Sequence, residues 1–556
     1  MKNGQKHIIN REVLEFNVSD RAHAQSIQNK ISEMVREKLN PAIDQLFSKM
    51  SGSDEIVRIE KLMIDLGTIS GKELENELVD KIISEIRAKI ERLLSSSGST
   101  VKRNQPNADG RFGNTSEVSV TNRPADKLAQ FIYFLEQGYF PWWGTTVVKN
   151  KVSSTNSFKN ILREVLNVEN ALLKNTIIPL LKKERVRKRL LFQCNHSCLY
   201  ELFKRLNINL FESYSAQFQV LLTCAGSAQI SKLLNLGFYE TALFYFSTET
   251  ELNTENQKTA FIKEILYLAL SKKPEEEKEK ILFDILRAAQ IKTQESQQKD
   301  LLLIMVAIIQ IATELTSKSQ LFQQMIQNLS AKDDSVINTL IEQAVKKVQK
   351  EISEKNNTQK YKSSESEGKG EGKGEDKAFS VFSSKPEIDK EQILVFNAGL
   401  VLVHPFLRYF FEGLNLLDAE LKFKSEIEAF KAVHLLQYIA TGKESTQEAE
   451  LPLNKILCGF DVTEPVPLNV PLSEEEKEEC LFLIKTVLER WEALKTTNQV
   501  ALRETFLQRE GILKQAGQSW NLTIERNTFD VMMEKLPWSV GLIKLPWCEQ
   551  ILVVEW

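Results

Sequence analysis

Few residues in this 556-residue sequence have the types and spacing that metal binding requires. The segment CNHSC, residues 194–198, places two thiols and His196 within about one helical turn, and thiolates and imidazoles are zinc ligands. A closed zinc site needs four donors, and the sequence has no second pair nearby. Because free cysteines are often simply buried, we interpret this segment as part of a core helix and predict no metal site.

Two histidines, His404 in VLVHPFLRYF and His434 in KAVHLLQYIA, have the chemistry of a general base. Neither has a candidate nucleophile beside it in the sequence, so both are interpreted as hydrogen-bonded core or boundary residues. The segment GTISGKE, residues 67–73, resembles a phosphate loop but carries Glu73 where a magnesium-binding Ser or Thr is required. The sequence therefore predicts no catalytic residue, no cofactor and no enzymatic activity.

Charge gives no general attraction to nucleic acid or to an anionic membrane, because 72 basic residues balance 75 acidic ones. The basic run KKERVRKR, residues 182–189, has no interleaved aromatic residues, which favours a solvated helix face paired with carboxylates. The longest apolar run, LLLIMVAII at residues 301–309, is too short to cross a bilayer and predicts a buried helix. Neither nucleic acid nor a membrane is expected as a partner.

Aromatic corners are the most distinctive local features. Trp142 and Trp143 lie between two glycines in QGYFPWWG, and Leu-Pro-Trp occurs twice near the end, with Trp538 and Trp547. Each pair is either a ligand platform or a packing device. A ligand site also needs converging polar groups, which the sequence does not indicate. We therefore predict that Trp142 or Trp143 seals a helix junction, and that the two prolines turn terminal strands while their tryptophans cover a core.

The elements that position these residues are expected to be mainly helical, because Gly and Pro are scarce and Leu, Ile, Lys and Glu abound. Two polar stretches, residues 95–126 and 353–390, lack the apolar residues that a packed core needs and are predicted to be flexible linkers. They separate an N-terminal α+β module, a central irregular helical bundle and a C-terminal α+β module with its strands last. These modules span residues 1–94, 127–352 and 391–556.

Within the N-terminal module, period-two alternation predicts strands around residues 14–18 and 56–66. Pro41 predicts a break between two helices, and residues 70–94 show the periodicity of a third helix. The six cysteines have irregular spacings, and the first residues lack the apolar core of a signal peptide. Synthesis in a reducing cytoplasm is expected.

Four segments occur in order in the C-terminal module: FNAGLVLVHPFL, HLLQYIATG, LPLNKILCG and LRETFLQREGIL, followed by the double Leu-Pro-Trp and VVEW. With HIINREVLEFNV and IEKLMIDLGTI near the N-terminus and FLEQGYFPWW in the centre, they resemble the tape measure proteins of contractile injection systems. The resemblance implies a non-enzymatic protein that sets inner-tube length and contacts inner-tube, baseplate or spike proteins. It implies no catalytic residues. The residues expected to have structural or interaction roles are Trp142, Trp143, His404, Pro405, Asn454, Trp538, Trp547 and Trp556.

The central module fits this role only with difficulty. As one continuous helix it would be about 340 Å long at about 1.5 Å per residue. A single long helix should be polar or carry a regular heptad stripe, whereas this module is apolar on several faces. It must extend inside a tube, pack with sister copies as a homo-oligomer, or belong to an assembly adaptor or chaperone that does not measure length. Assembly in the cytoplasm is expected, with incorporation into an extracellular or cell-bound particle left open.

Overall fold

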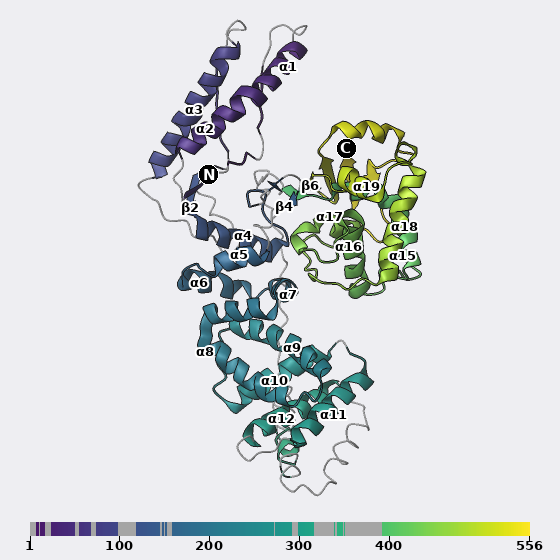
Figure 1. The fold of residues 1–556 in the computed structure, drawn as a ribbon. Coiled ribbons are helices and arrows are strands. Elements are labelled where there is room, and N and C mark those ends of the chain that lie inside the picture. Colours follow the sequence, from purple (N-terminus) through teal and green to yellow (C-terminus); the bar gives the residue numbers. More distant parts are fainter. Residues whose placement is uncertain are drawn as a thin grey trace, which may run out of the picture. The chain divides into compact units, whose positions relative to one another are not determined.

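The computed structural model describes residues 7–9, 12–16, 24–50, 55–59, 61–67, 74–97, 118–144, 147–148, 151–152, 158–271, 273–291, 298–315, 339, 342–348, 350 and 392–556. The chain forms two compact units, Met1–Thr176 together with Lys390–Trp556, and Ile177–Asp389. Helices dominate, and the one sheet of more than two strands among the described residues lies near the C-terminus (Figure 1). The predicted mainly α fold with terminal strands is confirmed. The low-complexity segment 353–390 lies outside the described residues.

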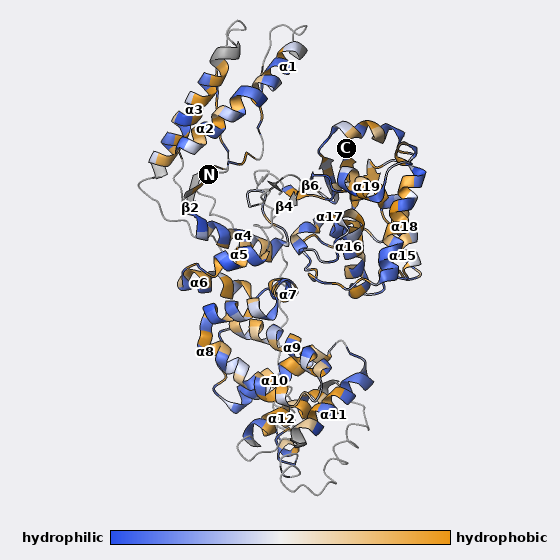
Figure 2. Cartoon of the chain, in the orientation of Figure 1, coloured by the Kyte–Doolittle hydropathy of each residue, from blue (hydrophilic) through white to orange (hydrophobic). Residues whose placement is uncertain are grey.

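The N-terminal helices are amphipathic and share one apolar core. They are α1 (Ala24–Met34), α2 (Asn40–Met50) and α3 (Leu74–Ser97), with a π-helical turn, η2 (Val35–Leu39), between the first two. Blue and orange bands alternate along them in Figure 2, as expected when one face is buried. The predicted break at Pro41 is wrong. The backbone stays helical at Asn40, whose N–H bonds to the carbonyl of Val35, and the π turn accommodates the proline.

A two-stranded antiparallel sheet follows, formed by β1 (Glu55–Ile59) and β2 (Val118–Asn122), with Glu55 opposite Asn122. The expected linker, residues 95–126, is therefore wrong at both ends, since residues 95–97 belong to α3 and residues 118–126 form a strand and the start of α4 (Arg123–Gln137). Residues 98–117 lie outside the described residues. The β-branched residues of VSVTN favour the strand. Asn122 then caps α4, accepting a hydrogen bond from the Ala125 N–H at 3.0 Å.

The second predicted strand is only half correct. Its ladder ends at Ile59, and residues 61–67 are extended without a strand partner among the described residues. Their alternation is as predicted, because Leu62, Ile64 and Leu66 pack against the N-terminal core while the residues between them are exposed. Residues 12–16 likewise form no strand. Leu14 packs on the core, but the side chain of Phe16 is exposed, and Val18 lies outside the described residues.

The central helices have 8 to 28 residues and irregular spacing. After the short strands β3 (Val147–Val148) and β4 (Lys151–Val152), they are α5 (Phe158–Val165), α6 (Asn170–Leu180), α7 (Glu184–Gln193), α8 (His196–Thr223), α9 (Ala228–Ser247), α10 (Glu255–Leu270), α11 (Glu275–Ile291) and α12 (Gln298–Leu315). Helices α9 and α10 meet closely at Gly237, where an added Cβ would lie 2.5 Å from the carbonyl oxygen of Ile265.

The apolar run 301–309 lies in α12, and Ile304, Met305 and Val306 are completely buried. The prediction of a buried helix is confirmed. Among the described residues, none of the helices combines the length and the apolar character that crossing a bilayer requires.

The basic run differs from its prediction. Arg189 on α7 is completely buried, and the Arg187 guanidinium donates to the carbonyl oxygens of Leu181 at 2.8 Å and Lys182 at 3.0 Å. Only part of the run is a solvated face, such as Lys188, which pairs with Glu184 at 2.8 Å. Guanidinium groups with long apolar stems can be buried where carbonyl oxygens satisfy them, which the sequence does not reveal.

The C-terminal module, residues 392–556, packs helices against a five-stranded sheet of order β5-β6-β7-β9-β8. Its strands are β5 (Gln392–Val395), β6 (Gly511–Ala516), β7 (Ser519–Ile524), β8 (Leu542–Ile543) and β9 (Ile551–Glu555). Its helical elements are η5 (Ala398–Val403), α15 (His404–Gly413), α16 (Glu426–Thr441), η6 (Glu448–Glu450), α17 (Pro452–Leu457), α18 (Glu474–Arg490), η7 (Glu492–Leu494), α19 (Gln499–Leu502), η8 (Arg503–Leu507) and η9 (Thr528–Lys535).

The sequence analysis predicted that all strands of this module come last in the chain, and this prediction is wrong. The strand β5 opens the module and pairs antiparallel with β6, which itself precedes Trp520. The apolar run of β5 is too short for periodicity to distinguish it from a buried helix. The sheet therefore joins the two ends of the module.

Candidate functional site

The two Leu-Pro-Trp corners attach the last segment of the chain to distant helices of the C-terminal module. The Trp538 indole N–H donates to the carbonyl oxygen of Leu402 at 3.0 Å, and that of Trp547 donates to Leu457 at 2.8 Å. The Trp538 ring packs edge-on against Phe406. Each corner therefore satisfies one carbonyl near a helix end and covers part of an apolar surface.

Replacing Trp547 by phenylalanine keeps an aromatic ring but removes the N–H donor. We expect the free energy of unfolding of the C-terminal module to fall by about 1–2 kcal/mol, because the Leu457 carbonyl loses its indole donor. Chemical denaturation of the full chain, followed by tryptophan fluorescence, measures this loss. Tyr409→Phe is the matched control, since its side chain is 73% exposed and its hydroxyl reaches water. Equal stability of Trp547→Phe and wild type would contradict the anchoring role.

A network of buried amides lies beneath these helices. The Asn397 side-chain amide donates to Gln437 Oε1 at 2.7 Å and to Asn454 Oδ1 at 2.6 Å. Asn454 in turn donates to Gln437 Oε1 and to the carbonyl oxygen of Val433, both at 3.1 Å. The three side chains are almost completely buried, so their hydrogen bonds fix the mutual positions of η5, α16 and α17.

An ion pair is buried next to Asn454 in the sequence. Lys455 Nζ lies 2.6 Å from Glu448 Oε1, and both side chains have no exposed area. Lys455 also donates to the carbonyl oxygen of Val462 at 3.0 Å. A buried pair of this kind specifies one arrangement of the chain, since separating the partners would leave a charge without its counter-ion in the core.

The two histidines form hydrogen bonds with backbone carbonyl oxygens and contact no reacting group among the described residues. His404 Nδ1 lies 2.8 Å from the carbonyl oxygen of Val401, and His434 Nε2 lies 2.8 Å from that of Pro467. Pro405 occupies the first turn of α15, where its missing N–H costs nothing. Burial lowers the pKa of both imidazoles, although the hydrogen bond to each carbonyl opposes this shift. Both rings therefore stay neutral at pH 7.

These lowered pKa values predict a loss of stability in mild acid. The unfolded chain binds a proton on each histidine near pH 6.5, whereas the folded chain resists protonation until lower pH. The stability present above pH 6.5 is therefore lost as the pH falls through the folded pKa values. Denaturation of the full chain between pH 7.5 and 5.5 measures the slope, and His404→Gln with His434→Gln should reduce it. An unchanged slope in that variant would exclude the histidines as its source.

The remaining predicted residues occupy two further clusters. The carbonyl oxygen of Trp556 accepts hydrogen bonds from Arg526 at 3.1 and 2.8 Å, and its ring lies 5.4 Å from the Arg509 guanidinium. Arg509 also makes a bidentate pair with Asp530 at 2.7 and 3.0 Å. This cluster holds the end of β9 next to η9.

In the N-terminal part, Arg58 of β1 forms an ion pair with Asp126 of α4, and its guanidinium lies 3.5 Å from the Trp143 ring centroid. Gln130 donates to Asp126 Oδ2 at 2.7 Å, and Trp142 is half-buried in the same turn. Trp143 therefore contributes to the packing of β1 against α4.

The segment CNHSC, residues 194–198, contains the N-cap and the first residues of helix α8. Asn195 accepts a hydrogen bond from the Cys198 N–H at 3.0 Å and so caps α8. Burial raises the pKa of the Cys194 thiol well above its ordinary value, which disfavours the thiolate that a metal requires. Among the described residues, no group of three or more His, Cys, Asp or Glu is placed to hold a metal ion.

Sequence reasoning selected Asn454 but missed its partners Asn397 and Gln437, and it also missed the Glu448–Lys455 pair. The available signal was the presence of polar residues inside apolar runs such as LVFNAG and HLLQYIATG. Spacing alone could not show which of them meet, because Asn397 and Asn454 are 57 positions apart.

Comparison with known protein families gives a match that extends over almost the whole chain. A sequence profile of the contractile injection system tape measure proteins matches residues 6–556. The chain belongs to this family. Searches of curated proteins and of solved structures find no match. This tape measure protein is thus a component of a contractile injection system that associates with other proteins of the particle, and its family is structural.

Proposed function

We propose that this tape measure protein sets the length of the inner tube, with its end modules docking on inner-tube, baseplate or spike proteins. The observation that carries the proposal is the family match over residues 6–556, which includes both end modules and the whole centre. The protein acts through contacts with other proteins, and none of its residues is assigned a catalytic role. Assembly takes place in the cytoplasm, and the chain is then incorporated into the particle.

We infer that the C-terminal module docks on its partners as a preformed unit. Its buried amides and ion pair fix its interior, and large apolar side chains remain exposed on its surface. They include Tyr409 (73%), Val531 (70%), Ile427 (69%), Phe482 (64%) and Leu542 (62%). Exposed apolar residues mark protein interaction surfaces where they gather into a patch. Trp538, Trp547, Trp556, His404, Pro405 and Asn454 have structural roles in this proposal, because they hold the elements that carry the exposed residues.

A second candidate function, an assembly factor that does not measure length, is favoured by the packed central helices. Aromatic rings from α8, α9 and α10 stack in one core, as where Tyr214 contacts Phe246 and Phe261. A ruler that extends along the tube must give up this packing. Its buried apolar surface must then find new partners, such as the tube lumen or sister copies.

The two functions differ in whether residue number or packing determines tube length. Deletion of residues 275–315, which include α11 and α12, shortens a ruler by about 60 Å if these residues are helical in the particle. Electron microscopy of purified particles measures this change directly. A length-setting role predicts a uniform shortening, whereas well-assembled particles of unchanged length would exclude it for this segment.

A substitution that disturbs packing but keeps the number of residues distinguishes an effect on particle length from an effect on the stability of the protein. Gly237→Leu adds a side chain where the backbone of α10 leaves no room, but it does not change the number of residues. A ruler carrying this substitution should give particles of wild-type length, even if fewer assemble. If this variant shortened the particles as much as the deletion does, the effect of the deletion would be attributed to lost packing rather than to lost length.

A further inference from the structure

The extended segment 61–67 has the character of a strand with an open edge. Leu62, Ile64 and Leu66 face the N-terminal core, while Met63 is 64% exposed. Among the described residues, no backbone–backbone hydrogen bond involves this segment. Backbone groups of this segment bond to side chains instead: Lys89 Nζ donates to the Met63 carbonyl oxygen at 2.6 Å, and the Gly67 N–H donates to Asp65 Oδ1 at 2.9 Å.

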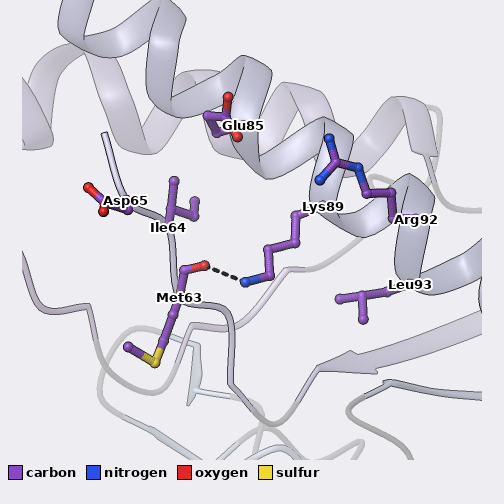
Figure 3. A pocket seen from close by; sticks show the side chains of 7 residues that line it. All are labelled: Met63, Ile64, Asp65, Glu85, Lys89, Arg92 and Leu93. Carbon is purple, nitrogen blue, oxygen red and sulfur yellow. Dashed lines mark hydrogen bonds between the residues drawn. The ribbon is translucent and has the colours of Figure 1, made fainter. Parts of the chain in front are cut away.

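The contact with Lys89 determines which edge is open. Successive residues of an extended strand direct their N–H and C=O groups to opposite edges. Since Met63 points its carbonyl group toward Lys89 on α3 (Figure 3), Leu62 and Ile64 direct theirs to the other edge. Since no backbone–backbone hydrogen bond of Leu62 or Ile64 occurs among the described residues, this second edge is a template for pairing with another strand.

Charge identifies the strand that fits this edge. The exposed side chains of the segment are Lys61, Met63 and Asp65, with opposite charges on the two sides of Met63. A complementary strand must therefore present a base toward Asp65 and an acid toward Lys61.

We propose that the occupant is a second copy of this protein, paired antiparallel about Met63. This register places Lys61 of each copy opposite Asp65 of the other and lets Leu62 exchange two hydrogen bonds with Ile64 of the other copy. The two Met63 residues then face each other as a non-hydrogen-bonded pair, with Cα atoms about 4.5 Å apart. Both Lys–Asp pairs contribute to association. The inference is independent of the length-setting role.

Self-association through this edge is weak in free solution. Five residues from each copy bury much less than the roughly 1,200 Å² of a stable interface, so the dissociation constant is expected between micromolar and millimolar. Gathering several copies in one particle raises their effective concentration and favours the pairing.

Disulfide trapping tests the register in the full-length protein. Met63→Cys places two thiols within disulfide reach across the two-fold axis, since bridged cysteines have Cα atoms about 4.4–6.8 Å apart. Under mild oxidation its covalent dimer should form at least about tenfold faster than that of Lys30→Cys, an exposed position on α1, with the wild type measuring the background of native cysteines. Equal rates for the two variants would overturn the proposal.

Charge exchange provides an independent test by sedimentation of the full chain. Lys61→Asp or Asp65→Lys alone creates two like-charged pairs in the dimer and should raise the dissociation constant about tenfold. The double variant, Lys61→Asp with Asp65→Lys, restores two opposite-charge pairs and should return the constant to within about threefold of wild type. A double variant as weak as the single ones would refute the pairing, and recovery excludes misfolding as the cause of the single effects.

Discussion

Replacing Glu448 by alanine is expected to lower the free energy of unfolding of the C-terminal module by about 3–5 kcal/mol. The substitution leaves the Lys455 ammonium in the core with no exposed area and without its counter-ion. The carbonyl oxygen of Val462 accepts one of its hydrogen bonds but carries no net charge. Chemical denaturation of the full chain measures the loss. Tryptophan fluorescence reports mainly on this module, which contains Trp491, Trp520, Trp538, Trp547 and Trp556 among the seven tryptophans of the chain.

The matched control replaces both charges by apolar residues. Glu448→Leu combined with Lys455→Met removes the ion pair without leaving a single buried charge, so it should recover most of the stability that Glu448→Ala loses. A loss below about 1 kcal/mol in Glu448→Ala would mean that water reaches Lys455, which contradicts its burial.

The second large effect is expected for Gly399→Ala in η5. An added Cβ would lie 1.7 Å from the carbonyl oxygen of Phe506 and 2.6 Å from its carbonyl carbon. Backbone atoms of η8 cannot rotate away as a flexible side chain does, so η5 and η8 must separate. Because overpacking a core costs about 1–3 kcal/mol and more where backbone must move, we expect a loss of at least about 3 kcal/mol, measured by the same denaturation experiment.

Gly413→Ala is the control for this prediction, since an added Cβ there meets no atom within 4 Å. Gly413 is the last residue of α15, and alanine should change stability there by no more than about 1 kcal/mol. If Gly399→Ala and Gly413→Ala lost similar amounts of stability, the cause would be backbone entropy and not the close packing of η5 on η8.

Local periodicity predicted the elements whose packing follows from their own sequence. The apolar run of α12 and the alternation of Trp520, Leu522 and Ile524 in β7 are examples, because each places its apolar residues on the face that is buried. The alternation of Leu62, Ile64 and Leu66 also gave the buried face correctly. It could not show that the ladder stops at Ile59, because strand pairing depends on residues far away in the chain.

The burial of polar side chains in the candidate site could not be predicted from the sequence. Lys455 lies in a segment that was selected, but a lysine in a sequence gives no sign of zero exposure or of pairing with Glu448. Arg189 was assigned to a solvated face for the same reason. Such residues are usually exposed, so their burial follows from the tertiary structure and not from their neighbours in sequence.

We propose that this tape measure protein stays in the finished particle as a structural component and does not leave after assembly. Quantitative mass spectrometry of purified particles, using peptides from residues 74–97, 228–270 and 474–524, tests it most directly. We expect all three regions in equal amounts and in a constant ratio to the inner-tube protein. Absence of these peptides from well-assembled particles, together with the presence of the protein in the producing cells, would contradict the claim.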